Sequence, residues 1–258
     1  MLAQETACND DGSGHGGAAG IGEGIAQVLA TRGWQVLVND VDAEGAQRVA
    51  RAVGGIALPG DVRNDPQGLV AQAVAAGGAL HALVNNAGII RRSPLADTTE
   101  AELDVVYGIN LKAMVRLSQA ALPHLQASAG AIVNISSIAA ESPQPAAGFY
   151  SMSKAGVSAF TRQAALEWGP RGVRVNAVAP GLIRTAMAEA VYSVPELHEK
   201  RRMMMPLRRI GVPAEIGKVV AFLLSDDASY VSGQVIAVDG GFTQTLIDHL
   251  PHPPTPAS

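Results

Sequence analysis

A tyrosine and a lysine, Tyr150 and Lys154, lie four residues apart in an amphipathic stretch, so on a helix they share one face. An ammonium close to a phenol favours the phenolate, which lets the phenol exchange a proton near neutral pH. Ser137 lies thirteen residues before Tyr150, after the apolar run AIVNIS, where its hydroxyl can hydrogen-bond a substrate oxygen that gains or loses charge. These residue types together indicate a proton shuttle beside a substrate oxygen.

A glycine-rich segment precedes the first strong helical pattern. Gly16, Gly20 and Gly22 have the spacing G-x-x-x-G-x-G, which lets a backbone approach a pyrophosphate and directs the amides of a helix N-terminus at its charge. A second glycine register overlaps it at residues 12–17, and a glycine-rich turn without a ligand explains either register.

Two acidic positions follow predicted strands. Asp40 ends the second apparent strand, eighteen residues after Gly22, where a carboxylate can accept hydrogen bonds from adenosine ribose hydroxyls. It would repel a 2′-phosphate, so it favours NAD over NADP. Asp61 and Val62 follow the third strand and offer a polar and an apolar contact for adenine. Each acidic residue can equally be a turn or helix-cap residue that binds no ligand.

The elements that must position these residues are visible as an alternation along the chain. Short apolar runs predict buried strands at residues 34–38, 56–58, 80–84, 131–135, 173–178 and 235–238. Amphipathic stretches predict helices at residues 21–31, 43–52, 66–76, 100–126, 150–168 and 214–224. This alternation is typical of a parallel sheet with helices on both faces, whose ligands bind beyond the carboxyl ends of the strands.

Composition limits the class of protein. Apolar residues make up 48% and charged residues 16% of the 258 residues, which excludes a disordered protein and favours one globular domain. The 19 Lys and Arg against 23 Asp and Glu leave no basic surplus for nucleic acid. No apolar run reaches the roughly 18 residues of a membrane span. The six histidines show no spacing that predicts a metal site, and the single cysteine and lack of a secretory pattern favour the cytoplasm.

Five motifs in order resemble those of the short-chain dehydrogenase/reductase family, from about residue 16 to about residue 243. They are the glycine motif at 16–22, NNAG at 85–88, YxxxK at 150–154, the segment 180–185 and VDGG at 238–241. The resemblance implies a single doubly wound α/β domain, Rossmann-like, with about seven parallel strands. We assign this domain to residues 1–250, followed by a loose proline-rich tail at residues 251–258.

The same resemblance implies an oxidoreductase that uses NAD, with NADP less favoured, to interconvert a secondary alcohol and a ketone by hydride transfer. The catalytic residues would be Asn110, Ser137, Tyr150 and Lys154. Asn110 would hold a water in a proton relay, although an asparagine inside a helix is more often structural. The cofactor contacts would come from Gly16, Gly20, Ile21, Gly22, Asp40, Asp61, Val62, Asn86, Gly88, Tyr150, Lys154, Pro180, Gly181, Ile183 and Thr185. The resemblance also implies a homotetramer.

The substrate side of the site is less specific in sequence. The segment at about residues 182–212 corresponds to the family's variable lid, in which Met187 and Tyr192 can line an apolar underside or pack in the core. Arg91 and Arg92 follow NNAGII, near the expected substrate mouth. Because similar arginine pairs occur in relatives that act on sugar acids, we hypothesise a sugar acid, polyol or hydroxy acid as substrate. A solvated arginine pair explains the same residues.

The resemblance is weakest before the glycine motif. The family has an apolar strand there, whereas this chain has CNDDGSGH at residues 8–15, and carboxylates in a central parallel strand carry a large desolvation cost. We therefore expect an atypical first strand within residues 1–15, either short, near Thr6–Cys8 with a longer loop, or poorly formed.

This departure leaves two alternative functions open. One is a catalytically weak relative that binds a nucleotide or a partner as an interaction protein. The complete set of catalytic residue types argues against it, because a binding protein needs no proton shuttle. The other is an NADPH-dependent 3-oxoacyl reductase, against which Asp40 and the apolar Val41 after it argue.

Overall fold

A parallel sheet organises the part of the chain that the computed structural model describes, residues 2–4, 20–185 and 193–245. Within these ranges, seven strands pair in the order β3-β2-β1-β4-β5-β6-β7. Their bounds are β1 Leu2–Gln4, β2 Leu37–Asn39, β3 Ile56–Ala57, β4 Ala82–Asn85, β5 Ala131–Ile135, β6 Arg174–Pro180 and β7 Val235–Val238. The strand order reverses between β1 and β4, and ligands of such sheets bind beyond the carboxyl ends at this switch point.

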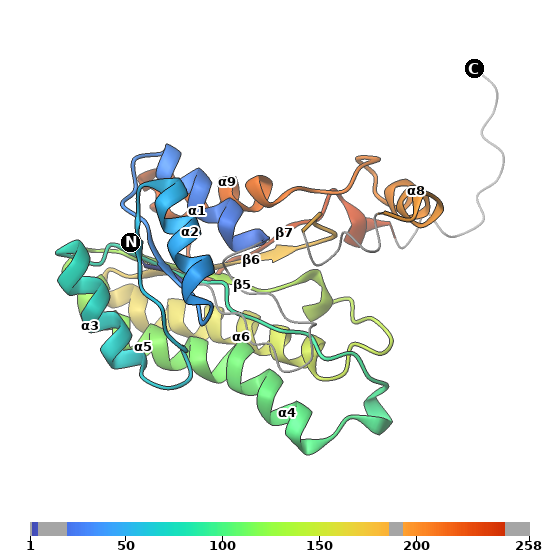
Figure 1. The fold of residues 1–258 in the computed structure, drawn as a ribbon, viewed down its shortest axis with the longest axis horizontal. Helices are drawn as coiled ribbons and strands as arrows, with labels where there is room; N and C mark the ends of the chain where they lie inside the picture. The colour runs from blue at the N-terminus through green and yellow to red at the C-terminus, as the bar shows by residue number, and fades with distance from the viewer. Residues whose placement is uncertain (1, 5–19, 186–192, 246–258) are drawn as a thin grey trace.

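Helices cover both faces of the sheet, with α1, α2 and α9 on one face and α3, α5 and α6 on the other (Figure 1). Their bounds are α1 Ile21–Thr31, α2 Ala43–Val53, α3 Pro66–Gly77, α4 Glu100–Tyr107, α5 Met114–Ala127, α6 Tyr150–Trp168, α8 Pro195–Met204 and α9 Pro213–Leu224. The predicted doubly wound α/β class is therefore confirmed. None of the described helices is long and apolar enough to span a membrane.

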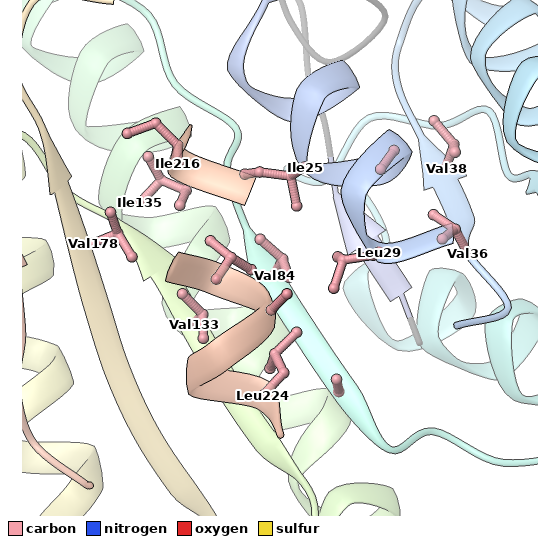
Figure 2. Packing of buried hydrophobic residues seen from close by; sticks show 14 of the residues in the cluster. Ile25, Leu29, Val36, Val38, Val84, Val133, Ile135, Val178, Ile216 and Leu224 are labelled. Carbon is pink, nitrogen blue, oxygen red and sulfur yellow. The ribbon is translucent and has the colours of Figure 1, made fainter. Parts of the chain in front are cut away.

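Successive strand residues pack against opposite helix layers. In β5, Ala131 and Val133 pack with α1 and α9, whereas Ile132 between them packs with α3, α5 and α6. Because side chains alternate along a strand, a doubly covered strand must be apolar on both sides. Figure 2 shows the hydrophobic cluster between the sheet and helices α1, α2 and α9. Its labelled members are Ile25, Leu29, Val36, Val38, Val84, Val133, Ile135, Val178, Ile216 and Leu224.

Several helices begin at caps that the sequence encodes locally. Asp42 accepts a hydrogen bond from the N–H of Glu44 at the start of α2. Asp65 accepts one from the N–H of Gly68 at the start of α3. Such side chains satisfy backbone donors that the first helical turn leaves free. The observed starts of α2 and α3 agree with the sequence prediction for this reason.

The predicted helix at residues 100–126 is not continuous. It divides into α4, a π-helical turn at Gly108–Ala113, and α5. Hydrophobic periodicity follows the average helical repeat, so it does not detect one wide turn inside a long helix. The π-helical turn contains Asn110, so this side chain has a different direction from the one that a regular α-helix would give it.

The first strand lies earlier than predicted. β1 occupies Leu2–Gln4 and pairs in parallel with both β2 and β4, in the centre of the sheet. The prediction of a strand near Thr6–Cys8 was therefore wrong about which residues fill the central position. Thr6–Cys8 itself, the acidic segment after it and the tail at 251–258 lie outside the described residues. The central strand is therefore built from residues that precede Asp10 and Asp11, whose carboxylates would be costly to desolvate inside the sheet.

Candidate active site

The loops after β4, β5 and β6 and the first turn of α6 meet at the carboxyl edge of the sheet. They bring together Tyr150, Lys154 and Ser137. The Nζ of Lys154 lies 5.8 Å from the ring centroid of Tyr150, and the side chain of Ser137 hydrogen-bonds to Tyr150. A phenol, an ammonium and an aliphatic hydroxyl therefore share one site beyond the ends of the strands.

The titration of Tyr150 differs from the expectation. Burial raises the pKa of this phenol, and the hydrogen bond from Ser137 and the positive charge of Arg92 lower it only partly. Burial therefore outweighs the two groups that lower the pKa, and the effect of Lys154 on the phenol stays a prediction. Burial also lowers the pKa of Lys154 to about 8. Its Nζ donates to the carbonyl oxygen of Ile135 at 2.7 Å, so the ammonium is fixed to the end of β5.

The two serines after β5 have different partners. The Oγ of Ser136 is buried, donates to the carbonyl oxygen of Lys154 at 3.0 Å and pairs with the Oγ of Ser158 at 2.9 Å. Ser137 is half-buried, and its Oγ accepts from the N–H of Ala139 at 3.1 Å. Ser136 therefore anchors α6, whereas Ser137 is the serine whose hydroxyl lies beside the phenol.

Asn110 is a buried clamp. Its Oδ1 accepts from the N–H of Ile89 at 2.8 Å, and its Nδ2 donates to the carbonyl oxygen of Ile89 and to the Oγ of Ser153, each at 2.9 Å. Both hydrogens of the amide nitrogen are thereby used. The side chain holds the loop after β4 against α6, and the water relay implied by the family resemblance stays a prediction.

Glycines form a cradle on the cofactor side of the site. A Cβ on Gly88 would lie 3.2 Å from the Nζ of Lys154 and 3.4 Å from the Oδ1 of Asn110. Gly20 begins α1 with φ of +79°, and no side chain caps this helix N-terminus. Uncapped amides and a close backbone approach are what a bound pyrophosphate and ribose require. The residues present therefore fit a nicotinamide dinucleotide.

The loop after β6 closes this cradle. A Cβ on Gly20 would contact the side chain of Thr185, and one on Gly181 would lie 2.5 Å from the Cβ of Asp239. Ile183 is buried and forms an isolated β-bridge with Gly211. The loop that starts at Pro180 is thus packed between the start of α1 and the turn after β7.

Other expected cofactor contacts occupy different surroundings. Ile21 packs against the core cluster beneath α1 and α9, and Asn86 is half-buried directly after β4. Gly22 is buried in the first turn of α1. Gly16, Met187 and Tyr192 lie outside the described residues.

Asp40 and Asp61 are held by bonds to nearby residues. The Oδ1 of Asp40, which is fully buried, accepts from the N–H of Asp42 at 2.9 Å. Burial raises the pKa of Asp61, but hydrogen bonds from Arg63 outweigh it and leave the pKa below its ordinary value. Val62 is buried in the cluster beneath α3, α5 and α6. Both carboxylates make turn contacts, and their adenosine contacts stay predictions.

The arginines after NNAGII act on different groups. The positive charge of Arg92 lowers the pKa of Tyr150. The positive charge of Arg91 lowers the pKa of Glu102 on α4. Arg92 is exposed and Arg91 is half-buried. The positive charge of Arg92 therefore acts on the candidate catalytic phenol.

Sequence reasoning missed the buried polar side chains that brace the site. The Nδ2 of Asn85 donates to the Oγ of Ser118 at 2.9 Å and to the Oδ1 of Asn134 at 2.7 Å, and Asn134 donates to Thr161. The signal for such a network is a small polar residue at a position where helical periodicity requires an apolar one.

Among the described residues, no group of three or more His, Cys, Asp or Glu could hold a metal ion.

Comparison with known sequences supplies the family. A family profile described as Enoyl-(Acyl carrier protein) reductase matches residues 16–243. The chain is 38% identical over 237 residues to 3-oxoacyl-(acyl-carrier-protein) reductase FabG of Thermotoga maritima, covering 88% of this chain and 94% of that protein. It is 36% identical over 243 residues to oxidoreductase UcpA of Salmonella typhimurium, covering 88% and 92%.

Solved structures agree with this assignment. A candidate gluconate dehydrogenase from Agrobacterium tumefaciens matches with a TM-score of 0.81 at 31% identity, covering 95% of this chain and 97% of that one. A candidate short-chain alcohol dehydrogenase from Sinorhizobium meliloti 1021 matches with a TM-score of 0.84 at 35% identity, covering 95% and 96%. The chain belongs to the short-chain dehydrogenase/reductase family, and it is an oxidoreductase that acts on CH–OH groups.

Proposed function

We propose that this protein is an NAD-dependent dehydrogenase that interconverts a secondary alcohol and a ketone, with a sugar acid or related hydroxy acid as substrate. The observation that carries the proposal is the shared site of Tyr150, Lys154 and Ser137 beside the cradle at Gly88. A bound nicotinamide accepts the hydride from the alcohol carbon, or supplies it to the ketone.

The chain's own residues perform the proton chemistry. In the oxidative direction, Tyr150 takes the hydroxyl proton as the C–H bond breaks, and the same proton returns to the substrate oxygen in reduction. The hydroxyl of Ser137 holds that oxygen beside the phenol. Lys154 places a positive charge near the phenol, which favours the deprotonated form against the opposing effect of burial.

The choice of NAD rests on Asp40. Its carboxylate lies at the end of β2, is fully buried, and is followed by Val41 rather than by a basic residue. A 2′-phosphate placed there would meet the negative charge of this carboxylate. Titration with NAD and NADP tests this directly, because a preference for NADP would contradict the assignment.

The choice of an acidic substrate rests on Arg92. Its charge reaches Tyr150, so a substrate whose oxygen meets the phenol would hold a carboxylate within reach of the guanidinium. One relative at 31% identity is described as a candidate gluconate dehydrogenase. A panel of gluconate-like acids, polyols and neutral cyclic alcohols, followed by NADH absorbance, should show the highest kcat/KM for the acids. Equal values for acids and cyclic alcohols would remove the idea.

A second candidate is reduction of a 3-oxoacyl group, since relatives at 38% and 39% identity carry that name. The same absorbance assay, run with NADH and with NADPH, separates the two functions. Consumption of NADPH with a 3-oxoacyl thioester, and no turnover of the acid panel, would favour this candidate. Binding of either cofactor without turnover of any substrate would instead favour the interaction protein.

We further propose that one domain spans residues 1–250 and acts as a cytoplasmic homotetramer. Two apolar side chains on α6, Leu166 and Met152, are 74% and 41% exposed, and burial of such side chains by a second copy would favour assembly. Light scattering of the purified protein should give four times the chain mass.

A further inference from the structure

Ser153 lies between two candidate catalytic residues. Its side chain is fully buried in the first turn of α6. The Oγ accepts a hydrogen bond from the Nδ2 of Asn110 at 2.9 Å and donates one to the carbonyl oxygen of Tyr150 at 2.7 Å. One hydroxyl therefore joins the π-helical turn to the backbone of the residue that carries the phenol.

This hydroxyl completes a longer connection. Asn110 binds both backbone groups of Ile89, and the preceding Gly88 lies against the Nζ of Lys154. A continuous path of hydrogen bonds and close contacts thus runs from the loop after β4, through Asn110 and Ser153, to the backbone of Tyr150. The links made by Asn110 join elements that are distant in sequence, whereas the bond from Ser153 to the carbonyl oxygen of Tyr150 is local to α6.

We propose that Ser153 is a positioning residue, which sets the orientation of the α6 first turn and hence the placement of the Tyr150 phenol and the Lys154 ammonium. This inference rests on the proposed function, in which those two groups move the proton. Ser153 touches neither the substrate nor the cofactor in this role. It acts by fixing the helix turn that contains both groups.

The chemistry of a hydroxyl suits this position. A serine Oγ donates one hydrogen bond and accepts others, so it can satisfy an amide N–H and a carbonyl at once. An alanine can do neither, and the buried N–H of Asn110 would then have no acceptor at this point. The amide and the helix turn would move to recover partners, and a displacement of about 1 Å at a reacting group can cost about a hundredfold in rate.

The matched control is Ser151, two residues earlier on the same helix. Its side chain is also buried, but its Oγ has no hydrogen-bond partner. Ser151→Ala therefore removes a buried hydroxyl from the same helical turn without breaking the connection. Ser153→Cys is an intermediate variant, because a thiol has a similar size but donates and accepts weakly.

The experiment compares wild type with these three variants, using the best substrate of the acid and alcohol panel. Ser153→Ala should lower kcat about tenfold to a hundredfold, with the Kd for NAD unchanged within about twofold. Ser153→Cys should lie between, and Ser151→Ala should match wild type. Because the chain has only four tyrosines, ultraviolet titration against Tyr150→Phe can isolate the phenol. In Ser153→Ala its pKa should shift by roughly half a unit or more.

The outcomes separate this inference from the function on which it rests. Turnover by wild type, with equal kcat and phenol pKa in Ser153→Ala and Ser151→Ala, would overturn the positioning role and leave the function intact. Absence of turnover by wild type would overturn the function. A Ser153→Ala variant that fails to fold would leave Ser153→Cys and its phenol titration as the deciding pair, and unchanged values there would also overturn the inference.

Discussion

The first turn of α6 and the edge formed by β2 and β3 hold their polar side chains in different ways. Lys154 on α6 bonds to Ile135, and Asn110 on the adjacent π-helical turn bonds to Ile89, partners nineteen and twenty-one residues away. At the β2–β3 edge, Asp40 and Asp61 bond to backbone N–H groups two residues on. The predicted proton-transfer side of the site is thus braced across elements, and the predicted adenosine side is shaped by turns.

The difference predicts how each region tolerates change. A group held by long-range buried bonds is placed accurately, and its loss should affect chemistry more than binding. A carboxylate oriented by a turn can be replaced with less disturbance to the rest of the site, so its loss should affect ligand choice more than rate.

The largest effect should come from Tyr150→Phe. This substitution removes the proton donor and little volume, so kcat should fall by about a thousandfold or more. NAD binding, measured by fluorescence or calorimetry, should remain close to that of wild type. A variant that keeps substantial turnover would mean that another residue is the acid.

The next effect concerns the two arginines. Arg92→Ala should raise KM for a sugar acid by about tenfold with a smaller change in kcat, because it removes a charge that pairs with the substrate carboxylate. Arg91→Ala is the matched control, since the charge of Arg91 reaches Glu102 instead. Equal effects of the two substitutions on the acid and on a neutral alcohol would contradict the distinction between them.

A moderate effect should follow from changing Asp40. Asp40→Ala should reduce the preference for NAD over NADP by about tenfold, because the repulsion of a 2′-phosphate is removed. Asp40→Asn separates charge from shape, as it removes only the charge. The ratio of kcat/KM for the two cofactors is the measurement, and an unchanged ratio in both variants would place Asp40 outside the cofactor site.

The smallest effect is a pH dependence of stability. Burial lowers the pKa of Lys154 from its ordinary value of 10.5 to about 8. Between these two pH values, the lysine is protonated in the unfolded chain and mostly deprotonated in the folded chain. Stability should therefore rise with pH across this window. Relative to Lys154→Met, the free energy of unfolding in urea should rise by about 1 kcal/mol between about pH 8 and about pH 9. A constant difference would mean that the ammonium keeps an ordinary pKa.

Much of the fold could be predicted from the sequence. The predicted bounds of β5, β7, α1 and α6 agree with the structure residue for residue. These elements have strong periodicity and flanking turn residues, which are local properties. The helix α8 inside the expected lid was not predicted, because its exposed, charged surface carries no apolar face to reveal it.

The candidate site divides in the same way. Tyr150, Lys154 and Ser137 could be predicted because helical spacing and strand ends are readable in one dimension. Ser153 could not, since its function depends on Asn110, which lies forty-three residues away in sequence and is brought close by the packing of α6 on the π-helical turn.

The sequence by itself therefore determined the alternation of strands and helices, the class of fold and the residue types of the candidate site, because periodicity, caps and spacing act over a few residues. Only the tertiary structure decided that β1 starts at Leu2, that burial raises the phenol's pKa, and that Asn110 is a clamp. Desolvation and hydrogen bonds between distant segments depend on which surfaces meet, and that is set when the helices close over the sheet.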